Sequence, residues 1–358
     1  MLFEIGKMKI KTIYFFLFVL LVSLNCSSNN SEIKRYYIVS RYNIENSVID
    51  SKCTLSIGNG EFIFTADITG LQTFPEFYTR GIPLETMSGW GWHMGEYREN
   101  SYHFCLGLIG LWILKENGEE ISVSDIKDPV QKLNLLTGEI DSRFNIEGVP
   151  VHLKTVCHPD YDMISAKIIS ELIGKKRLRI KINFPTDEPS PAGYAFNTPQ
   201  KHTTKILSDT NNLAIFRRNQ DNYNVIVWRN DADLKEAAKN LYYLEPNHAD
   251  SVYSFSCQFL NNPENGRIQN FGETEAASKK SWEKFWTTSS AVDFQEYNDP
   301  KSKELEERII LSRYLAKIQC CGSLLQAGAD TSYNNWFGKF HLEMHSWLPY
   351  HTIPLNGN

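Results

Sequence analysis

Hydrophobic and polar residues alternate along most of the chain between about residues 36 and 260. In RLRIKINF, residues 177–184, and in SVYSFSCQF, residues 251–259, every second side chain is apolar or aromatic. A period of two places alternate side chains on opposite faces of a β-strand. The segments are short, turn residues separate them, and no long helical pattern interrupts them. The pattern therefore predicts a large antiparallel β-sandwich rather than a parallel α/β sheet.

The spacing becomes helical after Asn262. The turn-rich NNPENG ends the β region, and ETEAASKKSWEKFW then places Trp282, Phe285 and Trp286 at positions i, i+3 and i+4. We expect these aromatic residues to be packing residues of a linker helix rather than a ligand site.

A second helix is predicted from Pro300, because Asp299 is a suitable N-cap and proline is favoured at the first helical position. A helix of this length needs a partner that buries its apolar face. We expect that face to comprise Leu305, Ile309, Tyr314 or Leu315, and Ile318. We expect a solvated face at Glu306, Glu307 and Arg308.

The first 26 residues have the pattern of an export signal. Three lysines precede the apolar stretch TIYFFLFVLLVSL, which is too short to favour spanning a bilayer, and Cys26 follows it after Asn25. This order resembles a bacterial lipoprotein signal, in which Cys26 would be lipidated; simple secretion is the alternative. The pattern predicts an exported protein of the periplasm or outer membrane, with membrane contact only through the anchor at Cys26.

Composition narrows the partners and the chemistry. Hydrophobic residues make up 42% of the chain, which supports a packed core, and the net charge of -5 without a basic block argues against nucleic acid as a partner. We expect no cofactor, no metal site and no disulfide framework. None of the remaining cysteines forms a C-x-x-C pair, and we interpret them as thiols, largely buried: Cys53, Cys105, Cys157, Cys257, Cys320 and Cys321.

Two regions of the chain point to one family. The first is LSIGNGEFIFTADITGLQTFPEFYTRGIPLETMSGWGWH, residues 55–93, and the second combines SWEKFW, ELEERIILSRYLAKIQ and NNWFGKFHLEMHSW. Together they resemble the six-hairpin glycosidases, and within them the relatives of the family 65 hydrolases and phosphorylases. The resemblance implies an N-terminal β-sandwich, a helical linker and an (α/α)6 barrel that holds the active site.

On this basis we assign the β-sandwich to residues 33–265, the linker to residues 270–298 and the start of the barrel to residues 299–358. A barrel of twelve helices needs well over about 150 residues, at the usual helix and loop lengths. We therefore expect an incomplete barrel, with the missing part as its natural partner and the general acid further along.

The C-terminal stretch NNWFGKFHLEMHSWLPYH supplies the main site candidates. The resemblance implies that it faces a sugar pocket, where tryptophan rings and hydrogen-bonding side chains would contact the sugar. The candidate substrate-binding residues are Trp336, Lys339, His341, Glu343, His345 and Trp347. Glu343 is expected to accept a substrate hydroxyl and is a weaker candidate for a catalytic carboxylate, since glycoside cleavage generally uses two.

Two other interpretations of this stretch compete with the sugar-binding one, and only one of them is retained. A metal site at His341 and His345 is disfavoured, because Glu343 would point roughly 200° away on the helix and the spacing is not H-E-x-x-H. A buried helix start with satisfied histidines stays open.

The front half holds two further candidate groups. Trp90, Trp92 and His93 lie in the loop GWGWH and would either line a subsite or pack between domains. Asp67 and Gln72 would either bind ligand or satisfy a turn, and the turn is favoured.

Together these features predict a glycoside hydrolase acting on a glycan or oligosaccharide in the cell envelope. Phosphorolysis is less favoured, because it would not conserve energy for the cell outside the cytoplasm. The alternative is a non-catalytic carbohydrate-binding module or a vestigial fragment that lacks the catalytic acid, so whether the chain is an enzyme as it stands remains open.

Overall fold

The computed structural model describes residues 35–93, 102–103, 105–186, 202–210, 212–218, 223–247, 250–288, 292–294, 296–297 and 299–319. From Tyr36 onward these residues belong to one compact unit. The proposed signal at residues 1–26 and the lipidation candidate Cys26 lie outside the described residues. Within the described part, no helix combines the length and hydrophobicity needed to cross a bilayer.

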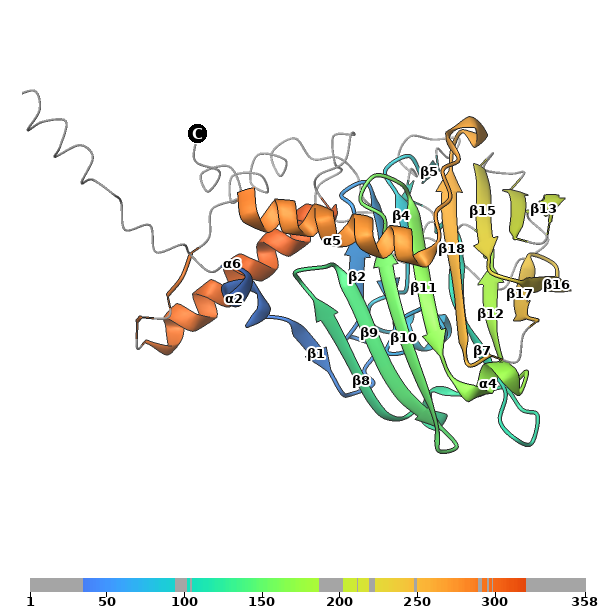
Figure 1. The fold of residues 1–358 in the computed structure, drawn as a ribbon, viewed down its shortest axis with the longest axis horizontal. Coiled ribbons are helices and arrows are strands. Elements are labelled where there is room, and N and C mark those ends of the chain that lie inside the picture. Colours follow the sequence, from blue (N-terminus) through green and yellow to red (C-terminus); the bar gives the residue numbers. More distant parts are fainter. Residues whose placement is uncertain are drawn as a thin grey trace, which may run out of the picture. The chain divides into compact units, whose positions relative to one another are not determined.

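The largest sheet is antiparallel throughout (Figure 1). Its nine described strands follow in the order β1 (Ile44–Asn46), β8 (Lys127–Asn134), β9 (Glu139–Ile146), β10 (Val149–Cys157), β11 (Met163–Ile169), β18 (Val252–Leu260), β15 (Tyr223–Arg229), β14 (Leu213–Arg218) and β13 (Thr204–Asp209).

Smaller antiparallel sheets complete the β-structure. One has the order β16 (Ala232–Ala238), β17 (Leu241–Pro246), β12 (Leu178–Asn183) and β7 (Leu108–Ile113). Another consists of β2 (Leu55–Gly58), β3 (Phe62–Ala66) and β4 (Thr86–Ser88), and a ribbon pairs β5 (Trp92–His93) with β6 (Tyr102–His103).

The helices are short except for two near the end of the described chain. They are α2 (Arg35–Ser40), α3 (Pro75–Tyr78), α4 (Glu171–Gly174), α5 (Phe271–Thr288) and α6 (Pro300–Gln319), with 3-10 turns η2 (Val123–Asp125) and η4 (Pro263–Asn265). The predicted architecture, an antiparallel β-sandwich followed by helices, is confirmed.

Strand alternation decides which side chains form the core. In β12, Leu178, Ile180 and Ile182 are buried and the residues between them are partly exposed, as the sequence pattern predicted. Strand β18 differs, because both of its faces are buried from Phe255 onward. The cause is α5, which packs across the outer face of β10, β11 and β18, so the alternation in β18 does not separate core from solvent (Figure 1).

The aromatic residues of SWEKFW join the two long helices to the sandwich, as predicted. Trp282 and Trp286 are buried, and the Trp282 ring stacks on Tyr314 of α6 with 4.9 Å between centroids. The indole N–H of Trp286 donates to the carbonyl of Leu135 at 2.7 Å. Gly138 lies beneath this cluster at a φ of 64°, and a Cβ there would stand 2.0 Å from the Trp282 Nε1.

Helix α6 begins as predicted, with the Asp299 carboxylate accepting the Lys301 N–H at 2.9 Å. Its buried face, however, is displaced by about one residue from the predicted stripe. Tyr314 and Ile318 are buried, while Leu305 and Leu315 are 50% and 47% exposed. The buried residues are Glu306, Ile310, Arg313, Tyr314, Ile318 and Gln319.

The prediction that Glu306 is solvated is wrong. Its side chain is 2% exposed and lies 2.9 Å from a guanidinium nitrogen of Arg41, and it also accepts the Tyr42 hydroxyl at 2.9 Å. A buried carboxylate is tolerated when a cation and hydrogen bonds satisfy it. Because Arg41 follows α2 directly, this ion pair fastens the first described helix to the last.

Candidate functional site

The C-terminal candidates cannot be placed. Trp336, Lys339, His341, Glu343, His345 and Trp347 all lie outside the described residues, so their roles stay predictions. The sandwich residues named from sequence are described in part. Asp67 and Gln72 belong to the turn after β3, whereas Trp90 lies between β4 and β5.

Asp67 forms the centre of a buried turn. One carboxylate oxygen accepts the N–H and the hydroxyl of Thr69 at 2.8 and 2.6 Å. The other accepts the N–H groups of Thr73 and Phe74 at 2.7 and 2.9 Å. Burial raises the pKa of Asp67 to about 6, against the lowering effect of these hydrogen bonds.

The side-chain amide of Gln72, like the carboxylate of Asp67, makes four hydrogen bonds within the fold. Its amide nitrogen donates to the carbonyls of Thr65 and Glu85, and its amide oxygen accepts from the Thr86 hydroxyl and the Ile109 N–H. Thr65 and Thr86 belong to the sheet of β2, β3 and β4, whereas Ile109 belongs to β7. Gln72 therefore joins two sheets, and the turn interpretation is supported over the ligand interpretation.

Trp90 is held by a partly buried acid, Asp162, that the sequence alone did not single out. Its indole N–H donates to Oδ2 of Asp162 at 2.6 Å, and the hydroxyl of Ser88 donates to the same oxygen at 2.6 Å. The Trp90 ring also lies 5.9 Å from the ring of Tyr223. These contacts make Trp90 a fixed anchor of the GWGWH loop. Trp92 and His93 continue from it into β5, and their side chains are not described.

Asn59 fixes the neighbouring loops. Its amide nitrogen donates to the carbonyls of His158 and Tyr161 at 3.2 and 3.0 Å, and its amide oxygen accepts the N–H groups of Glu61 and Phe62. The His158 ring stacks on Tyr161 at 4.4 Å. Burial lowers the pKa of His158, so its imidazole is neutral near pH 7. We call Asn59, Ser88, Trp90, His158 and Asp162 the Asp162 cluster.

This cluster lies beside the C-terminal end of α6. Gly60, at a φ of 105°, donates its N–H to the carbonyl of Ile318 at 3.0 Å. At Gly58 a Cβ would stand 2.8 Å from the same carbonyl. The hydroxyl of Tyr314 donates to the carbonyl of Ser56 at 2.9 Å. The glycines of IGNGEF therefore permit a close approach between the β2–β3 turn and α6.

The chemistry of Asp162 is that of a positioning group. Burial raises its pKa to about 6, although the hydrogen bonds from Ser88 and Trp90 favour the ionised form. Because both donors converge on Oδ2, this oxygen holds the loop rather than facing a ligand. No cluster of three or more metal-ligating side chains occurs among the residues that the structure describes.

The raised pKa of Asp162 predicts a pH-dependent stability. The folded protein keeps the Asp162 proton between about pH 4 and pH 6, whereas the unfolded chain has lost it, so this contribution to stability disappears as the pH rises through 6. The shift of roughly 2 units corresponds to about 3 kcal/mol. Asparagine cannot ionise, so Asp162→Asn should not lose this stability as the pH rises. Its free energy of unfolding relative to wild type should therefore increase by up to about 3 kcal/mol from pH 4 to pH 7, as measured by urea titration.

Asp50→Asn is the matched control, because Asp50 is an exposed aspartate outside the Asp162 cluster. Protonation of His158 at low pH disfavours folding, so its effect on stability is opposite to that of Asp162. His158 is present in wild type and in Asp162→Asn, so its effect cancels when the two are compared. Parallel pH profiles for wild type and Asp162→Asn would contradict the assignment.

Only weak signals for the Asp162 cluster are present in the sequence. HPDYD ends in a carboxylate at the start of an apolar strand, but its partners Ser88 and Trp90 are 74 and 72 residues away. A carboxylate between a turn and a buried strand was the only local indication.

No protein-family model matches the chain, and no curated protein matches it. Among solved structures it is similar to a protein assigned as a kojibiose phosphorylase from the human microbiome, at 11% identity and a TM-score of 0.53, over 81% of this chain and 42% of that chain. A bacterial glucoamylase complexed with acarbose matches at 8% identity and a TM-score of 0.48, over 77% of this chain and 44% of that chain.

A GH92 α-mannosidase from Bacteroides thetaiotaomicron matches at 9% identity and a TM-score of 0.36, over 80% of this chain and 42% of that chain. The chain thus spans less than half the length of each of these proteins. The first match supports the fold alone. The chain therefore shares the fold of the matched part of that protein, a β-sandwich with adjoining helices.

Proposed function

We propose that this chain is the β-sandwich part of a carbohydrate-active enzyme that cleaves glycosidic bonds in a glycan or oligosaccharide. The observation that carries the proposal is the structural similarity to the kojibiose phosphorylase over 81% of the chain. The sequence resemblance to six-hairpin glycosidases in residues 55–93 and in the C-terminal stretch supports the same conclusion.

In this proposal the sandwich positions the first helix of a helical catalytic domain. Three described contacts suit that role: the ion pair between Glu306 and Arg41, the hydrogen bond from Tyr314 to Ser56, and the hydrogen bond from Gly60 to Ile318. They fix α6 along its length, and the Asp162 cluster holds the Trp90 loop at the same end.

The finer assignments are also proposals. Glu343 accepts a substrate hydroxyl, the tryptophans and histidines around it contact the sugar, and the general acid belongs to the helical domain. Hydrolysis is proposed over phosphorolysis. The chain is also proposed to be exported and anchored through Cys26. Outside the cytoplasm, phosphorolysis would conserve no energy for the cell, which is why hydrolysis is preferred.

An activity comparison tests this function. The chain alone and the product of the gene with any sequence downstream of Asn358 are incubated with α- and β-linked oligosaccharides, with and without inorganic phosphate. We expect release of reducing sugar without phosphate, and a fall in kcat/KM of about 10²-fold or more for Glu343→Gln. Glu307→Gln, at an exposed position of α6, is the control.

A second candidate is carbohydrate binding without cleavage by this chain. The hydrogen bonds from Ser88 and Trp90 to Asp162 favour this candidate, because they show the acid positioning a loop. It predicts sugar binding without reducing-sugar release in either form. Failure of both forms to bind or cleave any oligosaccharide contradicts both candidates.

A further inference from the structure

The outer face of the largest sheet is only partly covered by α5. Near the middle of β11 and β18, the hydroxyls of Ser165 and Ser256 lie 2.7 Å apart, and Ser165 also contacts the Thr274 hydroxyl of α5 at 2.9 Å. The helix begins at Phe271, so the part of the sheet beyond this serine pair is left uncovered.

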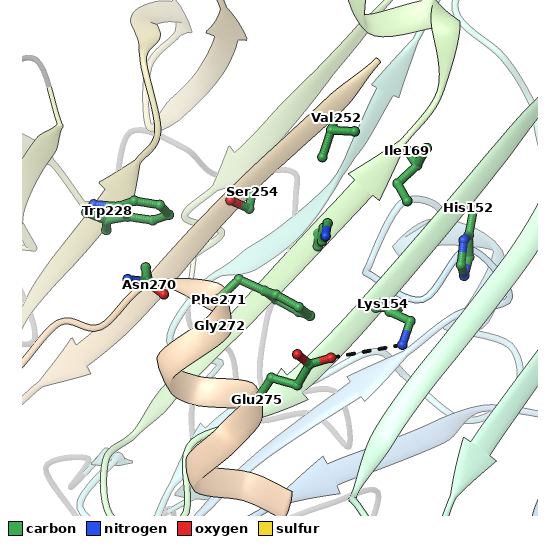
Figure 2. Close-up of a pocket in the computed structure, with 11 residues that line it drawn as sticks. His152, Lys154, Ile169, Trp228, Val252, Ser254, Asn270, Phe271, Gly272 and Glu275 are labelled. Atoms are coloured by element: carbon green, nitrogen blue, oxygen red, sulfur yellow. Dashed lines mark ion pairs between the residues drawn. The ribbon is translucent and has the colours of Figure 1, made fainter. Parts of the chain in front are cut away.

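The uncovered part forms an open pocket of about 450 Å³ (Figure 2). Strand β10 contributes His152 and Lys154, and Glu275 reaches toward them from α5. Trp228 lies on the opposite side, beside Asn270 at the start of the helix. The pocket is separate from the Asp162 cluster. Asp162 precedes the first residue of β11, whereas the pocket is lined by Lys167 and Ile169 in the second half of that strand.

The strand register arranges the pocket residues in rows. Lys154 is directly opposite Lys167, and Lys167 is directly opposite Ser254. In the next row Ile169 pairs with Val252, and these side chains are 40% and 42% exposed. The floor therefore combines an exposed aliphatic row with a row of hydrogen-bond donors.

The two lysines differ in their partners. Lys154 lies 2.8 Å from Glu139 and 4.0 Å from Glu275, which neutralise it. Lys167 has no ion-pair or hydrogen-bond partner among the described residues. Like charges on directly opposed strand positions are destabilising. An unpaired ammonium beside a second lysine is better explained by an anionic ligand than by folding.

Trp228 is the second feature that points to a ligand. It occupies an outward position of β15, opposite Ser256, where it is only half-buried. Its indole N–H has no partner among the described residues. A flat aromatic face next to aliphatic side chains and a few placed polar groups suits a pyranose ring, whose faces are apolar and whose rim carries hydroxyls.

We propose that this pocket binds a saccharide that carries a carboxylate, of the hexuronic acid type. The sugar ring lies on Trp228, the carboxylate pairs with the ammonium of Lys167, and Ser254 contacts a hydroxyl. This binding site is additional to the proposed bond-cleaving function, and it needs no catalytic group. It would hold an acidic glycan on the face of the sandwich while another part of the protein acts on it.

Titration calorimetry on the full chain tests the proposal, with a galacturonic acid trisaccharide and maltotriose as probes. We expect the acidic sugar to bind, more tightly at low salt because the contact is ionic. Trp228→Ala should weaken binding about tenfold or more, and Trp228→Phe should retain most of it. Lys167→Met should remove the preference for the acidic sugar.

The controls separate a binding effect from a folding effect. Lys132→Met removes a lysine from β8 of the same sheet, and Trp112→Ala removes a partly buried tryptophan from β7 outside the pocket. Both should leave the affinity unchanged. Absence of binding to the wild-type chain, or equal affinity in wild type and Trp228→Ala, overturns the proposal. Because no cleavage is measured, an inactive enzyme leaves the result unaffected.

Discussion

Replacing Asp67 by asparagine is expected to lower the free energy of unfolding by about 3–5 kcal/mol. Each carboxylate oxygen of Asp67 accepts two hydrogen bonds inside a fully buried turn. Whichever way the amide is placed, its NH₂ group would face N–H or O–H donors of Thr69, or N–H donors of Thr73 and Phe74. Buried donors would then lose their acceptor.

Asp50→Asn is the matched control for this prediction. Asp50 also accepts a backbone N–H two residues on, from Lys52 at 2.9 Å, but it is exposed. Its replacement should change the free energy of unfolding by less than about 0.5 kcal/mol in chemical denaturation. Equal effects of the two substitutions would show that the Asp67 turn does not stabilise the sandwich.

Replacing Trp282 by alanine is expected to cost about 3–5 kcal/mol, the usual range for removing a buried tryptophan. The ring contacts Tyr314 of α6, Trp286 of α5 and the turn at Gly138. Its removal should therefore loosen α6 more than the sheet. Hydrogen exchange of peptides from residues 300–319 should accelerate more than exchange of peptides from β18.

Tyr297→Ala is the control for Trp282→Ala, since Tyr297 is an aromatic residue between α5 and α6 that is 63% exposed. It should leave both stability and exchange nearly unchanged. If exchange rises equally in α6 and β18 after Trp282→Ala, the ring is an ordinary core residue and not the joint between helices and sandwich.

Local patterns predicted the secondary structure well because strand and helix periods are properties of short segments. The alternation in β12 and the aromatic spacing in α5 are both recovered in the structure. The start of α6 was equally predictable, since Asp299 and Pro300 act within a single turn.

Burial was less predictable wherever it depends on a distant segment. The outer face of β18 is covered by α5, and Glu306 is buried because Arg41 neutralises it from the other end of the described chain. A sequence period identifies which side chains share a face, but not which faces find a partner.

The same limit applies to the sites. Asp162 acquires its role from Ser88 and Trp90, and the outer pocket exists because β11, β18 and β15 are neighbours in the sheet although β15 and β11 are far apart in sequence. In NVIVW, the position of Trp228 out of phase with the buried valines was a usable signal for an exposed aromatic residue.

The buried cysteines carry a consequence for handling the protein. Cys105, Cys157 and Cys257 are sealed in the sandwich, and burial raises the thiol pKa, to about 12 for Cys105 and further for the other two. Only the thiolate reacts with oxidants and alkylating reagents. In the folded chain these sulfurs should stay silent toward iodoacetamide, while half-buried Cys53 reacts. Alkylation of Cys105, Cys157 or Cys257 would therefore occur only when the sandwich unfolds, so the extent of their labelling measures unfolding.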